Sequence, residues 1–125
     1  MPDANIFVAW VGILLGSVAG AIQGLFFRRD DWLGGYGSWR RRMFRLGHIS
    51  FFGLAFINLA FALTVRSLGL EESVAWASRM FILGAITMPL LCYLSGLKDS
   101  VRHLFFIPVL SVIAGTVMLL KALLA

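Results

Sequence analysis

Four long apolar stretches without Asp, Glu, Lys or Arg occupy most of this 125-residue chain. They are Ile6–Phe27, Leu46–Val65, Met80–Leu97 and Leu104–Leu120. About 20 apolar residues in a helix cross the ~30 Å hydrocarbon core of a bilayer, so each stretch is long enough to span it, the last only just. With their polar lead-in and capping residues, the third and fourth spans extend to about 74–97 and 101–121. We therefore predict an all-α integral membrane protein, a single four-helix transmembrane bundle over residues 1–125.

Basic side chains are concentrated in two segments between the predicted spans. Eight of the eleven Lys and Arg residues lie in the segments 28–45 and 98–102, which follow the first and third spans. Short segments rich in Lys and Arg remain on the cytoplasmic side of a membrane, so the basic loop 28–45 is predicted to face inward and both termini outward. The same charges favour anionic lipid headgroups, not nucleic acid, as a partner. A bacterial cytoplasmic (inner) membrane is the expected location.

The first span carries a glycine at every fourth position. Residues four apart lie on one face of a helix, so this series predicts a surface where a second backbone approaches closely. The series is Gly12, Gly16, Gly20 and Gly24. Packing against a neighbouring span of the same chain is the first interpretation, and a dimer or the helix of a partner subunit is the alternative. Asn58, an amide deep in the second span, is predicted to point into the bundle and to hydrogen-bond another helix.

The two histidines, His48 and His103, lie near the predicted inner ends of the second and fourth spans. Two imidazoles at similar depth on different helices can act as axial ligands of haem b, and Arg45 and Arg102 can then hold its propionates. Haem iron at these histidines is the one metal site that the sequence offers. A quinone site at the same residues is a related alternative. The simpler interpretation is that both histidines form hydrogen bonds at the membrane interface and that the chain binds no cofactor.

The second span of each predicted hairpin opens on a similar series of residues. A basic residue, a histidine, two phenylalanines and a helix-perturbing residue follow one another in 45–53 and in 102–108, with shifts of one or two positions. Both hairpins are predicted to run from outside to inside and back, so a repeat of this kind is parallel, with its axis along the membrane normal.

Composition and the placement of polar residues narrow the function classes. With 60% hydrophobic and 14% charged residues, the chain lies outside the range of soluble domains. No span contains a carboxylate, although proton-coupled transport and intramembrane acid–base catalysis usually need one. We expect no enzyme but an accessory or structural subunit of a larger membrane complex, in contact with other membrane subunits or with a second copy. A redox subunit with haem b or quinone is the alternative, followed by a small channel or transporter lined by Asn58.

Overall fold

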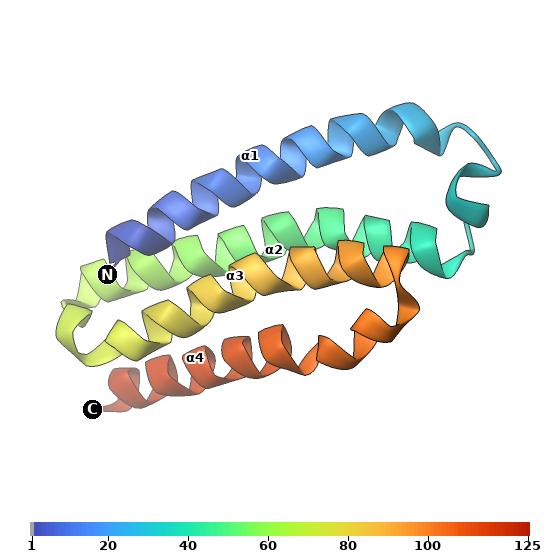
Figure 1. Ribbon diagram of the computed structural model, residues 1–125. Coiled ribbons are helices and arrows are strands. Elements are labelled where there is room, and N and C mark those ends of the chain that lie inside the picture. The colour runs from blue at the N-terminus through green and yellow to red at the C-terminus, as the bar shows by residue number, and fades with distance from the viewer. Residues whose placement is uncertain (1) are drawn as a thin grey trace.

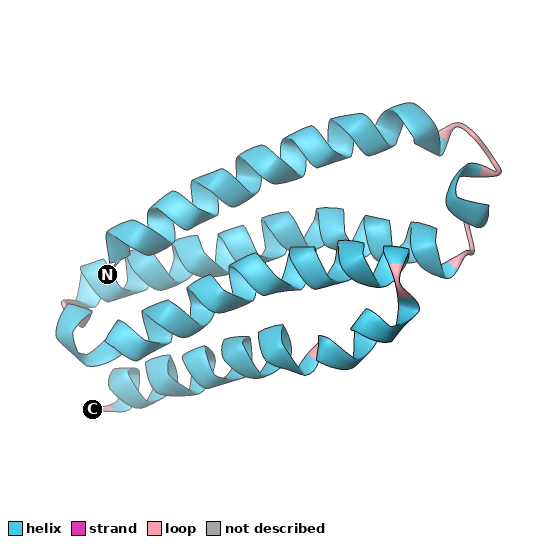
Figure 2. Cartoon of the chain, viewed as in Figure 1, coloured by secondary structure: helices cyan, strands magenta, loops and turns pink. Residues whose placement is uncertain are grey.

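The structure is a computed structural model that describes residues 2–125, and all of its long elements are helices (Figures 1 and 2). These are α1 (Pro2–Phe27), α2 (Trp39–Leu68), α3 (Ala75–Leu97) and α4 (Phe106–Leu124). Three short 3-10 segments connect them: η1 (Trp32–Gly34), η2 (Glu71–Val74) and η3 (Asp99–Leu104). Each long helix, taken with any 3-10 turn that leads into it, is long and apolar enough to cross a membrane. The prediction of an all-helical chain with four potential spans is confirmed.

The helices lie side by side in chain order, with α2 and α3 in the centre (Figure 1). Helix α1 packs mainly on α2, and α4 packs mainly on α3. Both termini lie at one end of the bundle, and the connections α1–α2 and α3–α4 lie at the other (Figure 1). In the most apolar window of each span, 17% of the residues are buried in α1 and α4, against 39% in α2 and α3. The two outer helices therefore leave most of their surface for lipid or for another protein.

Helix α2 begins earlier than we expected. Residues 39–45, which we placed in the basic loop 28–45, are helical because Ser38 caps α2: its hydroxyl oxygen accepts a hydrogen bond from the backbone N–H of Arg41 at 3.1 Å. The connection between α1 and α2 is thus residues 28–38. At its other end α2 stops at Gly69, whose left-handed φ of 65° favours glycine and lets the Leu70 N–H return to the Val65 carbonyl.

Helix α4 starts later than the predicted boundary near residue 101. Residues 99–104 form η3, and the α-helix runs over Phe106–Leu124. Pro108 stands in its first turn, where the missing N–H and the fixed φ of proline are tolerated. The helix start is therefore shifted towards the proline, and it continues three residues beyond the predicted end at 121.

The apolar core lies towards the end of the bundle that carries the termini. It consists of Phe61 and Val65 of α2, Val74 of η2, and Ala77 and Phe81 of α3. Small residues let α4 approach this core closely, because a methyl group added at Gly115 would lie 3.2 Å from the ring of Phe81. This packing fixes the relative positions of α2, α3 and α4, and leaves α1 to be held by separate contacts.

Candidate functional site

Three of the four glycines in the predicted stripe face α2. A Cβ atom added at Gly12 would lie 3.3 Å from the carbonyl oxygen of Phe51, and one at Gly16 would lie 2.9 Å from the ring of Phe52. One at Gly20 would overlap the imidazole of His48, whereas one at Gly24 would meet nothing within 4 Å. The glycine face therefore packs against α2 from Gly12 to Gly20, whereas the space beside Gly24 is open.

The two histidines occupy different places. His48 is half-buried on α2, where its imidazole packs on Gly20 of α1 and on the edge of the Phe52 ring, with ring centroids 5.5 Å apart. His103 is exposed in η3, which packs on α3. The structure therefore does not bring the two imidazoles into one site. Haem ligation by both histidines stays a prediction.

The arginines expected beside a haem are engaged with the two connections at the basic end of the bundle. Arg45 donates to the carbonyl oxygen of Tyr36 at 3.0 Å, and its guanidinium lies over the Tyr36 ring at 4.3 Å from the centroid. Arg102 forms an ion pair with Asp99 three residues earlier. Both arginines thus order the basic end of the bundle: Arg45 reaches from α2 to the α1–α2 connection, and Arg102 acts within the α3–α4 connection.

Asn58 is part of a buried hydrogen-bond network that joins three helices. Its side-chain N–H groups donate to the carbonyl oxygens of Leu54 at 2.8 Å and Phe81 at 3.2 Å, and its Oδ1 accepts from Asn5 Nδ2 at 2.7 Å. Asn5 also donates to the carbonyl oxygen of Ser78 at 3.3 Å and accepts from the Ser78 hydroxyl. All three polar side chains are buried. The network pins the start of α1 to α2 and α3.

Arg41 is buried at the opposite end of α1, although the sequence shows it only as one of six arginines in the segment 28–45. Its guanidinium donates to the carbonyl oxygens of Phe27 at 2.7 Å and Arg29 at 3.1 Å, which belong to the last turn of α1 and the residues beyond it. It also lies over the rings of Phe27 and Trp32, at 5.0 and 5.7 Å from their centroids. The Arg41 guanidinium therefore caps the C-terminus of α1.

Replacing Arg41 by glutamine should lower the free energy of unfolding by about 2–3 kcal/mol, because helix carbonyls and aromatic faces that it covers lose a charged partner. Its exposed neighbour Arg42 is the matched control, and Arg42→Gln should change stability by less than about 0.5 kcal/mol. Limited trypsin digestion of the protein in micelles tests this, since Arg41→Gln should speed cleavage after Arg28 and Arg29. Equal cleavage rates in the two variants would contradict the capping role.

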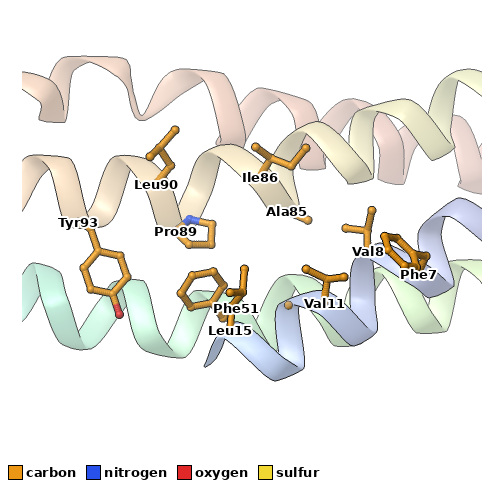
Figure 3. Close-up of a pocket in the computed structure, with 11 residues that line it drawn as sticks. Phe7, Val8, Val11, Leu15, Phe51, Ala85, Ile86, Pro89, Leu90 and Tyr93 are labelled. Carbon is orange, nitrogen blue, oxygen red and sulfur yellow. The ribbon is translucent and has the colours of Figure 1, made fainter. Parts of the chain in front are cut away.

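A groove open to the side of the bundle runs between α1 and α3, above α2 (Figure 3). Its larger part has a volume of about 490 Å³ and is lined by apolar side chains of all three helices, among them Phe7 and Leu15 of α1, Phe51 of α2, and Pro89 of α3. A smaller cavity of about 230 Å³ adjoins it at Tyr93. There Gln23 of α1 donates a hydrogen bond to the Tyr93 hydroxyl. This pair links α1 directly to α3, as the Asn5–Ser78 contact does nearer the termini.

No known family, characterised protein or solved structure matches this chain. Among residues 2–125 no three His, Cys, Asp or Glu side chains lie close enough together to hold a metal ion. The features that bear on function are thus the exposed outer helices, the internal polar network and the groove between α1 and α3.

Tyr93 and the groove were not among the sites predicted from the sequence, and for Gln23 the sequence predicts only a hydrogen bond to another helix. Gln23 was recognisable as a polar side chain near the inner end of the first span, but its partner is 70 residues away. Tyr93 carried no signal, because an aromatic residue in a span is equally compatible with a lipid-facing or a buried position. Their proximity follows only from the way α1 and α3 are placed on α2.

Proposed function

We propose that this chain is an accessory or structural subunit of a larger complex in a bacterial cytoplasmic membrane. The observation that carries the proposal is a division within the bundle: buried polar side chains join the helices to one another, and the outer faces of α1 and α4 are apolar. Asn5, Asn58 and Ser78 are consumed in hydrogen bonds with one another and with the backbone, so they hold the bundle together. The outer faces of α1 and α4 are apolar and exposed along their length.

This division favours a packing role over transport or catalysis. Asn58 is the amide that would line a transport path, and both ends of its side chain are engaged by neighbouring helices. The exposed side chains of α1 include Trp10, Leu14 and Leu25, which suit contact with lipid or with a partner helix. Other membrane subunits or a second copy of this chain are the proposed partners, with anionic lipids at the basic end of the bundle.

Photo-crosslinking in native membranes tests the accessory role. A photoreactive amino acid at Leu14 of α1, which is 62% exposed, or at Ile113 of α4, which is 52% exposed, should give an adduct with a defined partner subunit or a second copy. The same amino acid at the buried Val65 of α2 is the control and should give no intermolecular adduct.

Two results would overturn the proposal. The first is native mass spectrometry that finds only the monomer, together with no adduct at Leu14 or Ile113. The second is a Soret band in the purified protein that disappears in both His48→Ala and His103→Ala, because this would identify a haem-binding redox subunit.

We further propose that the termini face outward and the basic end faces the cytoplasm. In a Cys92→Ala background, a cysteine introduced at the exposed Ser67 should react with a membrane-impermeant maleimide on intact cells. A cysteine introduced at the exposed Ser100 should react only after permeabilisation, because the charges around it hold that end inside. The reverse labelling pattern would contradict this orientation.

A further inference from the structure

The groove between α1 and α3 has the length and lining of a site for a molecule with a long apolar tail. The larger cavity is lined along α1 from Phe7 to Leu15, and the smaller cavity, which shares Tyr93 with it, from Ala19 to Phe26, so the two together extend from Phe7 to Phe26. At 1.5 Å per residue this is about 28 Å, close to the thickness of a bilayer core. The larger cavity is in the range of about 300–1,000 Å³ that is typical of small-molecule sites. Figure 3 shows the side chains that line it on α1, α2 and α3.

The smaller cavity contains a polar group that lacks a partner. Gln23 is only 6% exposed, and its Nε2 donates to the Tyr93 hydroxyl, but its Oε1 has no hydrogen-bond partner among the described residues. An unpaired amide oxygen in an apolar site is costly, so this atom should be met by a donor from outside the chain. If the amide is turned, Tyr93 donates to Oε1 and Nε2 becomes the free group. The pair can therefore offer either an acceptor or a donor to a ligand.

Aromatic rings line the smaller cavity beside this polar pair. Phe26 and Trp32 are stacked, with ring centroids 5.4 Å apart and planes 13° apart, and Phe44 meets the Tyr93 ring edge-on at 5.0 Å. All four side chains line the smaller cavity. Such a site is complementary to a flat ring that carries a hydroxyl or a carbonyl oxygen.

We propose that the groove binds an isoprenoid quinone or its quinol, with the ring against Gln23 and Tyr93 and the tail along the larger cavity. A quinol hydroxyl can donate to Gln23 Oε1, and a quinone carbonyl can accept from the turned amide. The ester oxygens of a phospholipid are acceptors only, so they can meet the turned amide but cannot donate to Oε1 as a quinol hydroxyl can, and a phospholipid has no flat ring to place against the aromatic side chains. The site goes beyond the accessory role and does not depend on it. It also differs from the site predicted at His48 and His103, neither of which lines the groove.

Binding of decylubiquinone and of its reduced form to the purified protein in nanodiscs tests the proposal. Trp32 lines the head cavity, so bound quinone should quench tryptophan fluorescence with saturation. Gln23→Leu should weaken binding about tenfold, and Tyr93→Phe, which removes one oxygen atom, about threefold. Thr116→Val is the control, because this exposed hydroxyl on α4 bonds only its own helix, and it should leave the affinity unchanged.

A second variant distinguishes the contribution of the quinone tail to binding from that of the quinone ring. Val11→Phe narrows the larger cavity and should weaken binding of decylubiquinone, but not of a tailless benzoquinone. Circular dichroism and size-exclusion profiles identical to those of the parent protein establish that each variant is folded. The proposal is overturned if quenching does not saturate, if Gln23→Leu and Tyr93→Phe bind as Thr116→Val does, or if phosphatidylglycerol in the nanodisc displaces the probe.

Discussion

Replacing Asn58 by alanine should lower the free energy of unfolding by about 2–4 kcal/mol, because the change opens a cavity and leaves buried polar groups without a partner. The Asn58 side chain is fully buried and meets Asn5, Leu54 and Phe81 on three helices. Water cannot replace those contacts inside a bilayer. Unfolding by sodium dodecyl sulfate in mixed micelles, followed by circular dichroism, measures the loss.

The control for Asn58→Ala is Thr116→Ala on α4. The Thr116 side chain is exposed and its hydroxyl bonds the Val112 carbonyl of its own helix, so its loss should cost less than about 0.5 kcal/mol. A double-mutant cycle with Asn5→Ala should show a coupling energy of about 1 kcal/mol between the two asparagines. Strictly additive losses would contradict the network.

Replacing Gly16 by leucine should destabilise the bundle by about 3 kcal/mol, because the added side chain forces α1 away from α2. A single Cβ atom at Gly16 already lies 2.9 Å from the Phe52 ring and 3.0 Å from the Phe51 Cβ atom. One of these contacts involves the first atom of the Phe51 side chain, which cannot rotate away. The same unfolding assay measures the effect.

Gly24 provides a matched control on the same helix. Its added Cβ atom meets nothing within 4 Å, so Gly24→Leu should change the unfolding free energy by less than about 0.5 kcal/mol. The two positions have the same spacing pattern in the sequence, and only the structure distinguishes them. Equal losses in the two variants would mean that the stripe acts through a partner chain and not through α2.

The helical architecture could be predicted because hydropathy and charge determine which segments enter a membrane. The sequence also indicated the inward position of Asn58, through the period of small and polar residues on its helix. It did not indicate Asn5, which lies one residue before the first predicted span. Which of the adjacent Arg40, Arg41 and Arg42 is buried depends on where α2 begins. Ser38 was the available signal for that start, since serine is a preferred N-cap residue.

The candidate sites were harder to predict because depth along a helix says nothing about position around a bundle. His48 and His103 have similar predicted depths, yet His48 packs on α1, whereas His103 is exposed in η3. For the same reason the pairing of Gln23 with Tyr93 could not be read from their positions. A row of four helices and a closed ring of four helices are both compatible with the same apolar pattern, and they bring different residues together.

The network of Asn5, Asn58 and Ser78 has a consequence for the biosynthesis of this protein. Asn5 and Ser78 are 73 residues apart, and at about 5–20 residues per second a ribosome needs several seconds to make the chain between them. Once α2 has been made, Asn5 can donate to Asn58, but the hydrogen bonds between Asn5 and Ser78 form only when the third helix arrives. We therefore expect chains truncated after Leu68 to be held by the insertion machinery or degraded. Chains that extend past α3 should be released into the membrane and remain intact.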